Sequence, residues 1–477
     1  MAEARAPRIT RRGLLIGGGA GVGLLVGWAL WPRTYAPNLI AAPGEHIFNA
    51  FVKIGTDGHV TVVVPQAEMG QGVTTTLPQI VADELGADWR TVAVEPAPPN
   101  PLYANTLFAE EWEAEQGSRL PHWAVEQGAI RHGLMVTGGS TSVRGFETRL
   151  REAGAVARAL LCMAASARWD ADWRACDTAG GFVTRGDDRL RFGELAGEAA
   201  GHKLPDDIPL RTGRENRLTG KSLPRLDLPS KVDGTVNYAG DIRLPDMVFA
   251  SIAQGPLGDT RLKGVDKAAA NRVPGVIAVV ETERWVAAVA TNWWAADRAI
   301  AAMKPRFETT GAVPGDRAID HALDAAFERG TRIASAGDVG AVFKGAQVIA
   351  AEYRAGLVVH ATIEPLCATA SIEHGELQLW IGTQVPGFAA AAAAGATGID
   401  ASRITIHPMM IGGSFGRRYE TEIAGQAALL AQKLQRPVQL VWSRAEEMRQ
   451  DRFRPAAVAR MAAKLGPGGR IDAWLAK

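Results

Sequence analysis

Three glycine-rich loops, each followed by a predicted helix, constrain the fold of this 477-residue chain more than any other feature. A loop without side-chain bulk lets backbone amides approach a ligand closely, and the start of the following helix favours anions. A purely structural turn is the alternative for any one of the loops, and none matches the G-x-x-x-x-G-K-S/T phosphate-binding pattern. Together they indicate a large, phosphate-bearing organic cofactor held from several sides. Their glycines are Gly70, Gly72, Gly138, Gly139, Gly412, Gly413 and Gly416.

Strand-like and helix-like patterns alternate along the chain around these loops. The segments predicted as helices are 77–85, 143–168, 295–303 and 423–434. Those predicted as strands are 51–54, 59–64, 91–95, 248–253, 276–280, 285–290, 348–353, 368–372, 377–381, 404–406 and 438–442. A further hairpin begins at 462–475, and the chain stops inside it. We therefore expect the last domain to be incomplete.

Composition excludes several classes of protein. The length predicts two or more domains. Lys plus Arg number 52 against 51 Asp plus Glu, and this balance argues against a nucleic-acid binder. The only cysteines are Cys162, Cys176 and Cys367, with no C-x-x-C pair, so this chain carries no disulfide scaffold, zinc ribbon, iron–sulfur cluster or c-type haem attachment. We expect Cys162 and Cys367 to be buried and unreactive.

The amino terminus has the pattern of an export signal. Arg11 and Arg12 precede an uncharged, glycine-rich run over 13–31, as in twin-arginine signals. A plain membrane anchor is the alternative, because nineteen uncharged residues can span a bilayer of about 30 Å. A dinucleotide-binding loop fits poorly, since no strand precedes it and Val22 stands where that motif needs glycine.

From about residue 44 to 477 the sequence resembles the large, molybdopterin-binding subunit of the xanthine oxidase family of molybdenum hydroxylases. Within it, the resemblance is to the isoquinoline 1-oxidoreductase beta-subunit and periplasmic aldehyde dehydrogenase branch, which has the loops 69–72 and 139–142 in a permuted, amino-terminal position. Several ordered motifs over this span make the resemblance specific. They lie at 223–227, 231–234, 238–241, 292–296, 360–365, 382–386, 412–416 and 442–448.

The resemblance implies an α+β fold in which permuted molybdopterin-binding domains flank an α/β hammerhead-like domain. The Pro-punctuated, polar stretch before residue 226 and a break after 308 mark the boundaries. The implied organisation is a twin-arginine signal or tether at 1–42, a molybdopterin-binding region at 43–205, a linker at 206–225, the hammerhead-like domain at 226–308, a second linker at 309–335, and an incomplete molybdopterin-binding domain at 336–477.

The resemblance also implies the residues of the site. Gln384 matches the glutamine whose amide reaches an oxo group of molybdenum, and no side chain of this chain has to ligate the metal. The positions that match the cofactor-binding loops of the family are Gln71, Gly72, Gly139, Ser140, Thr141, Ser142, Gly412, Gly413, Phe415, Gly416 and Arg417. For Arg417 and Arg418, a solvated helix start is the alternative to a substrate or phosphate contact.

Two departures from the family pattern stand out. Ser414 occupies a position where glycine is common, and serine resists a positive φ, which puts the loop geometry there in question. The glutamate of a Gly-x-Gly-Glu loop, which acts as catalytic base in the family, has no match in this sequence. We expect the chain as given to turn over little by itself. Glu364 matches a structural position of the family rather than that base.

The function implied is that of a large subunit of an exported molybdenum hydroxylase, which oxidises an aldehyde or an N-heteroaromatic ring with water as the oxygen source. The cofactor would be molybdenum with molybdopterin cytosine dinucleotide. Electrons would leave through a separate small [2Fe–2S] subunit and a membrane cytochrome c in the periplasm. A non-catalytic cofactor-binding or assembly protein, and a flavin or nicotinamide oxidoreductase, are the alternatives.

Overall fold

The computed structural model describes residues 35–213, 217–311 and 313–477. The chain divides into two units, 1–38 and 39–477, and all the helices and strands given below lie in the second. Most of the predicted export segment, 1–42, including Arg11 and Arg12, lies outside the described residues. Within the described ranges, no helix combines the length and the apolar character that crossing a membrane requires.

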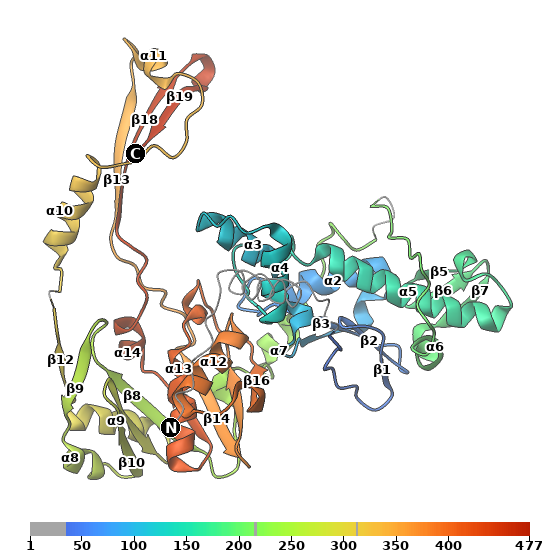
Figure 1. Cartoon of the computed structure of the whole chain (residues 1–477). Coiled ribbons are helices and arrows are strands. Elements are labelled where there is room, and N and C mark those ends of the chain that lie inside the picture. The colour runs from blue at the N-terminus through green and yellow to red at the C-terminus, as the bar shows by residue number, and fades with distance from the viewer. Residues whose placement is uncertain (1–34, 214–216, 312) are drawn as a thin grey trace, which may run out of the picture. The chain divides into compact units, whose positions relative to one another are not determined.

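The first part of this unit is a four-stranded sheet ordered β1-β2-β3-β4, with helices packed against it (Figure 1). β2 and β3 match the strands predicted over 51–54 and 59–64 and pair antiparallel as a hairpin, and β4 returns parallel to β3 after a crossover through α2. The elements of this part are β1 (Glu45–Ile47), β2 (Val52–Gly55), β3 (Val60–Val64), α2 (Val73–Leu85), β4 (Val92–Pro96), α3 (Thr106–Glu115), α4 (His122–Arg131), α5 (Glu147–Trp169), β5 (Asp177–Ala179), β6 (Phe182–Arg185), β7 (Asp188–Arg191) and α6 (Phe192–Ala199).

Helices α2 and α5 confirm the helices predicted over 77–85 and 143–168, with α5 starting four residues later than expected. Their backbones approach closely at Gly154, where a Cβ atom would lie 2.8 Å from the carbonyl oxygen of Val81. Leu77 on α2 and Leu161 on α5 are fully buried in the same apolar core as Val62 of β3. Each such burial contributes roughly 1.5–3 kcal/mol, so this core holds the first two glycine loops against one sheet.

The largest sheet has seven strands in the order β10-β11-β8-β17-β14-β15-β16. Its β8–β17 and β15–β16 pairs are parallel and its other pairs antiparallel. Because β8 pairs with β17, the sheet joins the regions predicted as separate domains, 226–308 and 336–477, so their predicted boundary is not a break in the sheet. Its strands are β8 (Val248–Gln254), β10 (Val276–Glu281), β11 (Trp285–Ala290), β14 (Cys367–Glu373), β15 (Glu376–Ile381), β16 (Ile404–Pro408) and β17 (Val438–Val441).

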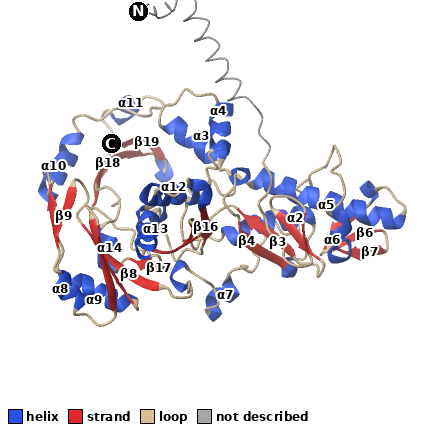
Figure 2. Cartoon of the chain, turned by 60° about the horizontal axis from the view of Figure 1, so that its bottom comes forward, coloured by secondary structure: helices blue, strands red, loops and turns tan. Residues whose placement is uncertain are grey.

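Helices cover this sheet, as Figure 2 shows for α8 and α9 beside β8 and for α12 and α13. α9 and α13 confirm the helices predicted over 295–303 and 423–434. α12 was not predicted; it begins at a proline and packs on α13 at Gly425, where a Cβ atom would lie 3.1 Å from the carbonyl oxygen of Ala392. The helices here are α7 (Leu228–Asp233), α8 (Lys267–Asn271), α9 (Trp293–Met303), α12 (Pro386–Thr397), α13 (Glu422–Leu434) and α14 (Arg444–Arg449).

Three smaller sheets complete the described structure, and one of them is the antiparallel sheet β5-β6-β7. β9 (Thr260–Gly264) pairs with β12 (Arg306–Thr309), and the antiparallel order β13-β18-β19 includes the hairpin predicted at 462–475. The remaining elements are α10 (Asp316–Ala326), α11 (Val339–Phe343), β13 (Ile349–Ala355), β18 (Ala457–Leu465) and β19 (Ile471–Ala476).

The three cysteines of the sequence are all free thiols. Cys162 on α5 and Cys367 on β14 are buried, as expected, whereas Cys176 is half-buried. Burial raises the pKa of Cys162 to about 12 and also raises the pKa values of Cys367 and Cys176. Since the thiolate is the reactive form, all three thiols are held in their unreactive state near neutral pH.

Candidate cofactor-binding site

Glu68 caps the first turn of α2 with its buried carboxylate. Its Oε1 accepts hydrogen bonds from the amides of Gly70 (2.8 Å) and Gly72 (3.0 Å). Its Oε2 accepts them from the amide (3.1 Å) and the hydroxyl (2.8 Å) of Thr74. Arg225 Nη2 lies 3.3 Å from Oε1. A carboxylate of the chain itself therefore occupies the helix start that the sequence pattern offered to an anionic ligand.

Gln71 stabilises its own loop. Its Oε1 accepts a hydrogen bond from the Met69 amide (2.7 Å), and its Nε2 donates one to the Ala67 carbonyl (2.8 Å). Gly70 and Gly72, on either side of it, have φ of +108° and +89°, which glycine adopts without strain. The loop is thus pre-formed, and the predicted pterin contact Gln71 presents an exposed side chain whose polar atoms are engaged locally.

The second loop, 138–142, uses most of its predicted ligand-binding groups internally. The hydroxyl of Thr141 donates to the Gly138 carbonyl (2.7 Å), and that of Ser142 donates to Gln66 Oε1 (2.9 Å). Ser140 differs, because it is exposed at φ +54° and its hydroxyl bonds to no residue that the structure describes. Among the three predicted hydroxyls, that of Ser140 alone faces solvent without a partner in the described ranges. Gly139, at φ +61°, precedes it.

The third loop, 412–416, resolves the question raised by Ser414. The positive φ angles fall on Gly413 (+98°), Phe415 (+56°) and Gly416 (+103°), and Ser414 is not among them. Serine is therefore accommodated without left-handed strain. Its buried hydroxyl donates to Gln384 Oε1 and accepts from the amide of Arg418 (3.1 Å), which fixes the loop from inside.

The backbone amides of residues 413–416 are the groups of this loop that can bind a ligand. None of the four donates a hydrogen bond to another residue in the part of the chain that the structure describes. Successive unpaired amides at a bend of the backbone form an anion-binding concavity. His360 lies beside it, with Nε2 3.6 Å from the position of a Cβ atom on Gly416. Asp451 fixes the imidazole by accepting from its Nδ1 (2.7 Å) and from the His360 amide.

Gln384 connects the second and third loops. Its Nε2 donates to the Thr137 carbonyl (2.6 Å), which also accepts from the Tyr419 hydroxyl (3.2 Å), and its Oε1 accepts from Ser414. Backbone hydrogen bonds join Gln384 and Thr137 (3.0 Å) and Gln384 and Arg418 (3.1 Å). The side chain predicted to face the metal centre is thus 3% exposed and lies where segments from both halves of the chain meet.

Arg417 and Arg418 are buried, each 1% exposed, so the alternative of a solvated helix start is wrong. Arg417 donates to the Gln450 carbonyl (3.3 Å), and its Nε lies 3.3 Å from Asp451 Oδ1. Arg418 pairs with Glu364 (3.0 Å) and donates to its carbonyl (2.7 Å). Nη1 of both arginines finds no hydrogen-bond partner among the described residues.

Glu364 and Arg418 form a buried ion pair directly under the third loop. Burial raises the pKa of Glu364 and lowers the pKa of Arg418, while their mutual attraction opposes both shifts. Glu364 Oε2 also accepts from the Gly412 amide (2.9 Å), and a Cβ atom on Gly412 would lie 2.5 Å from that of Glu364. Only glycine leaves room for this carboxylate, which explains the first glycine of the loop.

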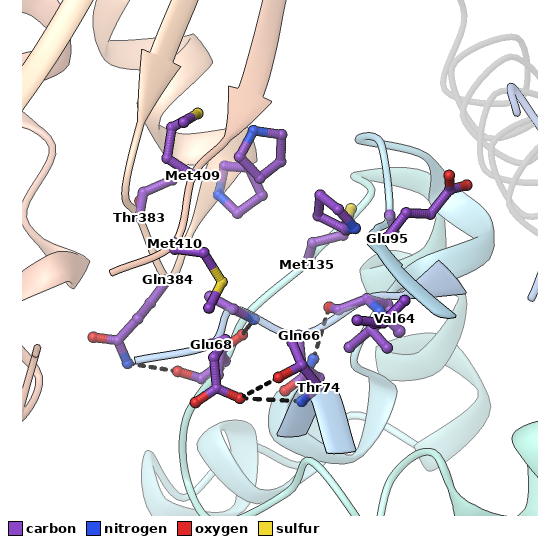
Figure 3. Close-up of a pocket in the computed structure, with 18 of the residues that line it drawn as sticks. Val64, Gln66, Glu68, Thr74, Glu95, Met135, Thr383, Gln384, Met409 and Met410 are labelled. Carbon is purple, nitrogen blue, oxygen red and sulfur yellow. Dashed lines mark hydrogen bonds between the residues drawn. The ribbon is translucent and has the colours of Figure 1, made fainter. Parts of the chain in front are cut away.

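A cavity of about 270 Å³ adjoins Gln384 and Glu68 (Figure 3). Segments from the ends of β3 and β4, the residues before α12 and the residues after β16 line it. The first loop reaches the third here, because the Ile411 amide donates to the Glu68 carbonyl (3.1 Å). The structure thus brings Glu68 and Thr137, which precede the first and second loops, together with Gln384, and Ser414 of the third loop bonds to Gln384.

These residues fit an anionic, multi-ring cofactor. The third loop offers unpaired amides in place of side-chain bulk, and the two carboxylates nearest the loops, Glu68 and Glu364, are each paired with an arginine. An anionic group therefore meets neutralised surroundings rather than free negative charge. The fit is carried by the amides of 413–416, whereas the hydroxyls of Thr74, Thr141 and Ser142 are engaged within the protein.

Comparison with known protein families finds two domain matches along the chain. A molybdopterin cofactor-binding domain matches residues 325–476, and a second domain of the same description matches residues 16–99. These matches, together with the relatives described below, support a molybdopterin-binding large subunit of the xanthine oxidase family. The resemblance inferred from the sequence is thereby confirmed, as is the mixed α+β class, which the observed helices and sheets show directly.

Three relatives illustrate the range of this family of large subunits. The chain is 28% identical to the beta-subunit of isoquinoline 1-oxidoreductase from Brevundimonas diminuta, over 98% of this chain and 65% of that protein. It is 28% identical to the membrane-bound aldehyde dehydrogenase (pyrroloquinoline-quinone) of Gluconacetobacter polyoxogenes, over 98% and 59%. It is 29% identical to one of the subunits of nicotinate dehydrogenase from Pseudomonas putida, over 83% and 32%. The chain spans less than two thirds of the length of these relatives.

Among solved structures, the aldehyde oxidoreductase from Desulfovibrio gigas is similar with a TM-score of 0.43 and 14% identity, over 86% of this chain and 51% of that one. A likeness of this size does not carry the family assignment, which rests on the two domain matches and the sequence relatives.

Three residues of the candidate site were not given a role from the sequence. Glu68 caps α2, Thr137 receives the Gln384 amide, and Asp451 orients His360. An acidic residue shortly before a helix start was a readable signal for Glu68. No signal in the sequence marked Asp451, because its partner His360 lies 91 residues away.

Proposed function

We propose that this chain is the large subunit of an exported molybdenum hydroxylase that oxidises an aldehyde or an N-heteroaromatic ring with water as the oxygen source. One observation carries the proposal. The domain match at 16–99 contains the loop 68–72, the match at 325–476 contains the loop 412–416, and the two loops meet through the Ile411–Glu68 hydrogen bond beside Gln384. Both cofactor-binding stretches thus contribute to one site.

Within this proposal, the amides of 413–416 bind the anionic part of the cofactor, and Gln384 lies next to the reacting centre. Gln71, Gly72, Gly139, Ser140, Thr141, Ser142, Gly412 and Arg417 complete the proposed contacts. The molybdenum group, when bound, supplies the two-electron oxidation that turns an aldehyde and water into a carboxylic acid, two protons and two electrons. The chain's own residues hold the loops in shape, with Ser414 and Thr137 fixing the Gln384 amide.

The proposed partners follow from what the chain lacks in sequence. None of the three cysteines belongs to an iron–sulfur motif, so the electrons leave through a small [2Fe–2S] subunit and then a membrane cytochrome c. Two of the relatives are named as single subunits of larger enzymes, which supports a multi-subunit enzyme. The proposed cofactor form is molybdopterin cytosine dinucleotide.

The proposed location is the periplasm, reached through the twin-arginine motif at Arg11 and Arg12, with an inner-membrane tether through the uncharged run 13–31 as the alternative to release. The double substitution Arg11→Lys, Arg12→Lys keeps the charge and removes the motif. We expect it to retain the chain in the cytoplasm, measured by fractionation against the unaltered chain. Equal export of both would refute this route.

The decisive experiment measures cofactor content in the full chain, purified from a host that makes molybdopterin cytosine dinucleotide. We expect molybdenum and acid-released CMP in equal amounts, one of each per chain. Gly416→Ala should lower both, because it adds a side chain beside His360 at a φ of +103°. Gly398→Ala is the matched control, since Gly398 also has a positive φ, +74°, but open space around it.

The outcomes separate the candidate functions. Molybdenum at background in a folded chain would refute the proposal, and a flavin absorption band in its place would favour a flavin enzyme. Molybdenum and CMP at full content, without oxidation of aldehydes or isoquinoline in the complex with an iron–sulfur subunit, would favour the non-catalytic cofactor-binding alternative.

A further inference from the structure

The cavity beside Gln384 has a lining that is unusually poor in free polar groups. Its volume of about 270 Å³ is slightly below the ~300–1,000 Å³ of drug-sized ligand pockets, which suits a molecule of one or two rings. Prolines and methionines dominate its walls, and methionine sulfur makes favourable contacts with aromatic rings. The apolar lining residues are Val64, Pro65, Ala67, Val94, Pro96, Ala97, Met135, Pro386, Pro408, Met409 and Met410.

The polar side chains of the lining are already hydrogen-bonded to the protein. Gln66 Nε2 donates to the carbonyls of Pro65 (3.0 Å) and Val136 (3.2 Å), and its Oε1 accepts from Ser142. The Thr137 hydroxyl accepts from the Ala67 amide (2.8 Å). Gln384 and Glu68 are engaged as described above. These groups offer no uncompensated donors to an anion, so a charged ligand would lose its hydration without replacement.

The charged groups around the cavity also leave an anion without a partner. The lining contains two carboxylates, Glu68 and Glu95, and no lysine, arginine or histidine among the residues that the structure describes. The cation next to Glu95 is Lys53 (2.8 Å), which is shared with Glu45 (2.8 Å). The cation next to Glu68 is Arg225 (3.3 Å), which also pairs with Asp227 (2.7 Å), and Lys231 pairs with Asp227 as well (2.5 Å). Neither cation is available to a ligand carboxylate.

Asn237 is the exception among the polar lining residues. It is exposed, and its side-chain amide bonds to no other residue within the described ranges. A carboxamide donates one well-directed hydrogen bond to a ring nitrogen or a carbonyl oxygen. The cavity therefore offers apolar walls, two carboxylates whose cations are engaged within the protein, and a single free amide.

We infer that this cavity selects an uncharged aromatic molecule of one or two rings with a single acceptor atom, and excludes analogues that carry a carboxylate. Calling this ligand the substrate rests on the proposed function. The selection itself follows from the lining, and it narrows the substrate to neutral N-heteroaromatic rings and neutral aromatic aldehydes.

The test compares isoquinoline with isoquinoline-3-carboxylate, at a pH where the ring nitrogen of isoquinoline is unprotonated, by calorimetric titration into the purified full chain. Isoquinoline should bind roughly tenfold or more tightly than the carboxylate, because the cavity gives the carboxylate no partner. Its affinity should not change with salt, since no charge pair forms. Equal affinities, or tighter binding of the carboxylate, would overturn the inference.

Two variants locate the binding in this cavity. Glu95→Gln removes one negative charge from the lining and should raise the affinity for the carboxylate several-fold while leaving isoquinoline unchanged. Glu198→Gln, the same change at an exposed carboxylate outside the lining, should alter neither affinity. Asn237→Ala should weaken isoquinoline several-fold by removing the free amide. Unchanged affinities in Glu95→Gln and Asn237→Ala would place the binding elsewhere and overturn the inference.

The experiment also separates this inference from the proposed function. A chain that binds isoquinoline with this selectivity but holds no molybdenum refutes the proposed function and supports the cavity assignment. A chain that holds molybdenum and binds the two ligands equally refutes the cavity assignment alone.

Discussion

Glu446 is a buried carboxyl group outside the candidate site whose environment couples folding to pH. It is 3% exposed at the start of α14, where its Oε1 accepts from the Gln254 amide (2.8 Å). Burial raises its pKa from 4.5 to about 7, because no lysine or arginine forms an ion pair with it among the described residues. Ionising this group inside the protein therefore opposes folding.

We expect the free energy of unfolding to fall as pH rises from about 4.5 to about 7 on account of Glu446. The folded state binds this proton more tightly than the unfolded state, so the contribution is complete below the lower value and lost above the upper one. Its size is roughly 3 kcal/mol at most. Urea denaturation across this pH range should show a shallower dependence in Glu446→Gln. An identical slope in both proteins would contradict the assignment.

Asp451 contacts two side chains near the third loop at once. It is 1% exposed and contacts both His360 and Arg417. Asp451→Asn leaves the Arg417 guanidinium buried without a negative partner, so we expect a loss of about 3–5 kcal/mol in unfolding free energy. Glu198→Gln, which breaks the exposed pair with Arg168, should cost less than about 1 kcal/mol. Similar losses of unfolding free energy in both variants would show that the buried Arg417–Asp451 pair does not stabilise the protein more than an exposed pair does.

At the scale of elements, the second glycine loop depends on a contact with the third. A Cβ atom on Gly138 would lie 1.5 Å from the Tyr419 hydroxyl, which donates to the Thr137 carbonyl. We expect Gly138→Ala to destabilise the protein by about 1–3 kcal/mol, because the ring has to move. Adding Tyr419→Phe removes the clashing oxygen and should recover part of the loss, measured by chemical denaturation, because the ring carbon Cζ would still lie 2.8 Å from the new Cβ atom.

The control for this pair lies on α4. Gly128→Ala adds a methyl group in the middle of that helix, where nothing lies within 4 Å. It should stabilise the protein by up to about 1 kcal/mol, since alanine favours helix more than glycine does. If Tyr419→Phe fails to rescue Gly138→Ala, strain elsewhere in the loop is the cause of the loss.

The sequence allowed most elements around the loops to be predicted, because strand alternation and helical periodicity are local signals. The hairpin β2–β3 and the helices α2, α5, α9 and α13 are examples. α12 was missed although Pro386 at its first position and its run of alanines are helix signals. The positive φ at Phe415 could not be foreseen, because only the packing of Ser414 against Gln384 and Arg418 decides which residue of the loop turns.

At the scale of the whole molecule, two large apolar cores divide the stability between them. One lies within 48–199 and includes Leu150; the other lies within 248–442 and includes Leu440. Separate cores tend to unfold as separate cooperative units. We expect two thermal transitions by calorimetry.

Matched substitutions assign the transitions. Leu150→Ala and Leu440→Ala each remove a fully buried side chain, which costs roughly 2–5 kcal/mol. Each should lower a different transition and leave the other in place. If both variants shift a single transition equally, the two cores unfold as one unit.

The family and the α+β class could be predicted from the ordered motifs, whereas the arrangement of the regions could not. The pairing of β8 with β17 joins residues nearly two hundred positions apart, such as Val248 and Val438. No local sequence pattern predicts this pairing. The same holds for the site, where Gln384 bonds to Thr137 across 247 positions. The predicted cofactor contacts, from Gln71 to Arg417, stay predictions that the measurement of cofactor content will test.

The native cysteines are protonated and largely buried, so this chain is well suited to site-directed labelling for distance measurements by spectroscopy. Cys162 and Cys367 are buried and will not compete for a maleimide or methanethiosulfonate label, and Cys176→Ser removes the half-buried third thiol. A new cysteine at an exposed position in each half of the chain, such as Ser140 and Phe388, then carries the only two reporters. Pulsed electron resonance between them would measure in solution how the regions around the loops move when a ligand binds.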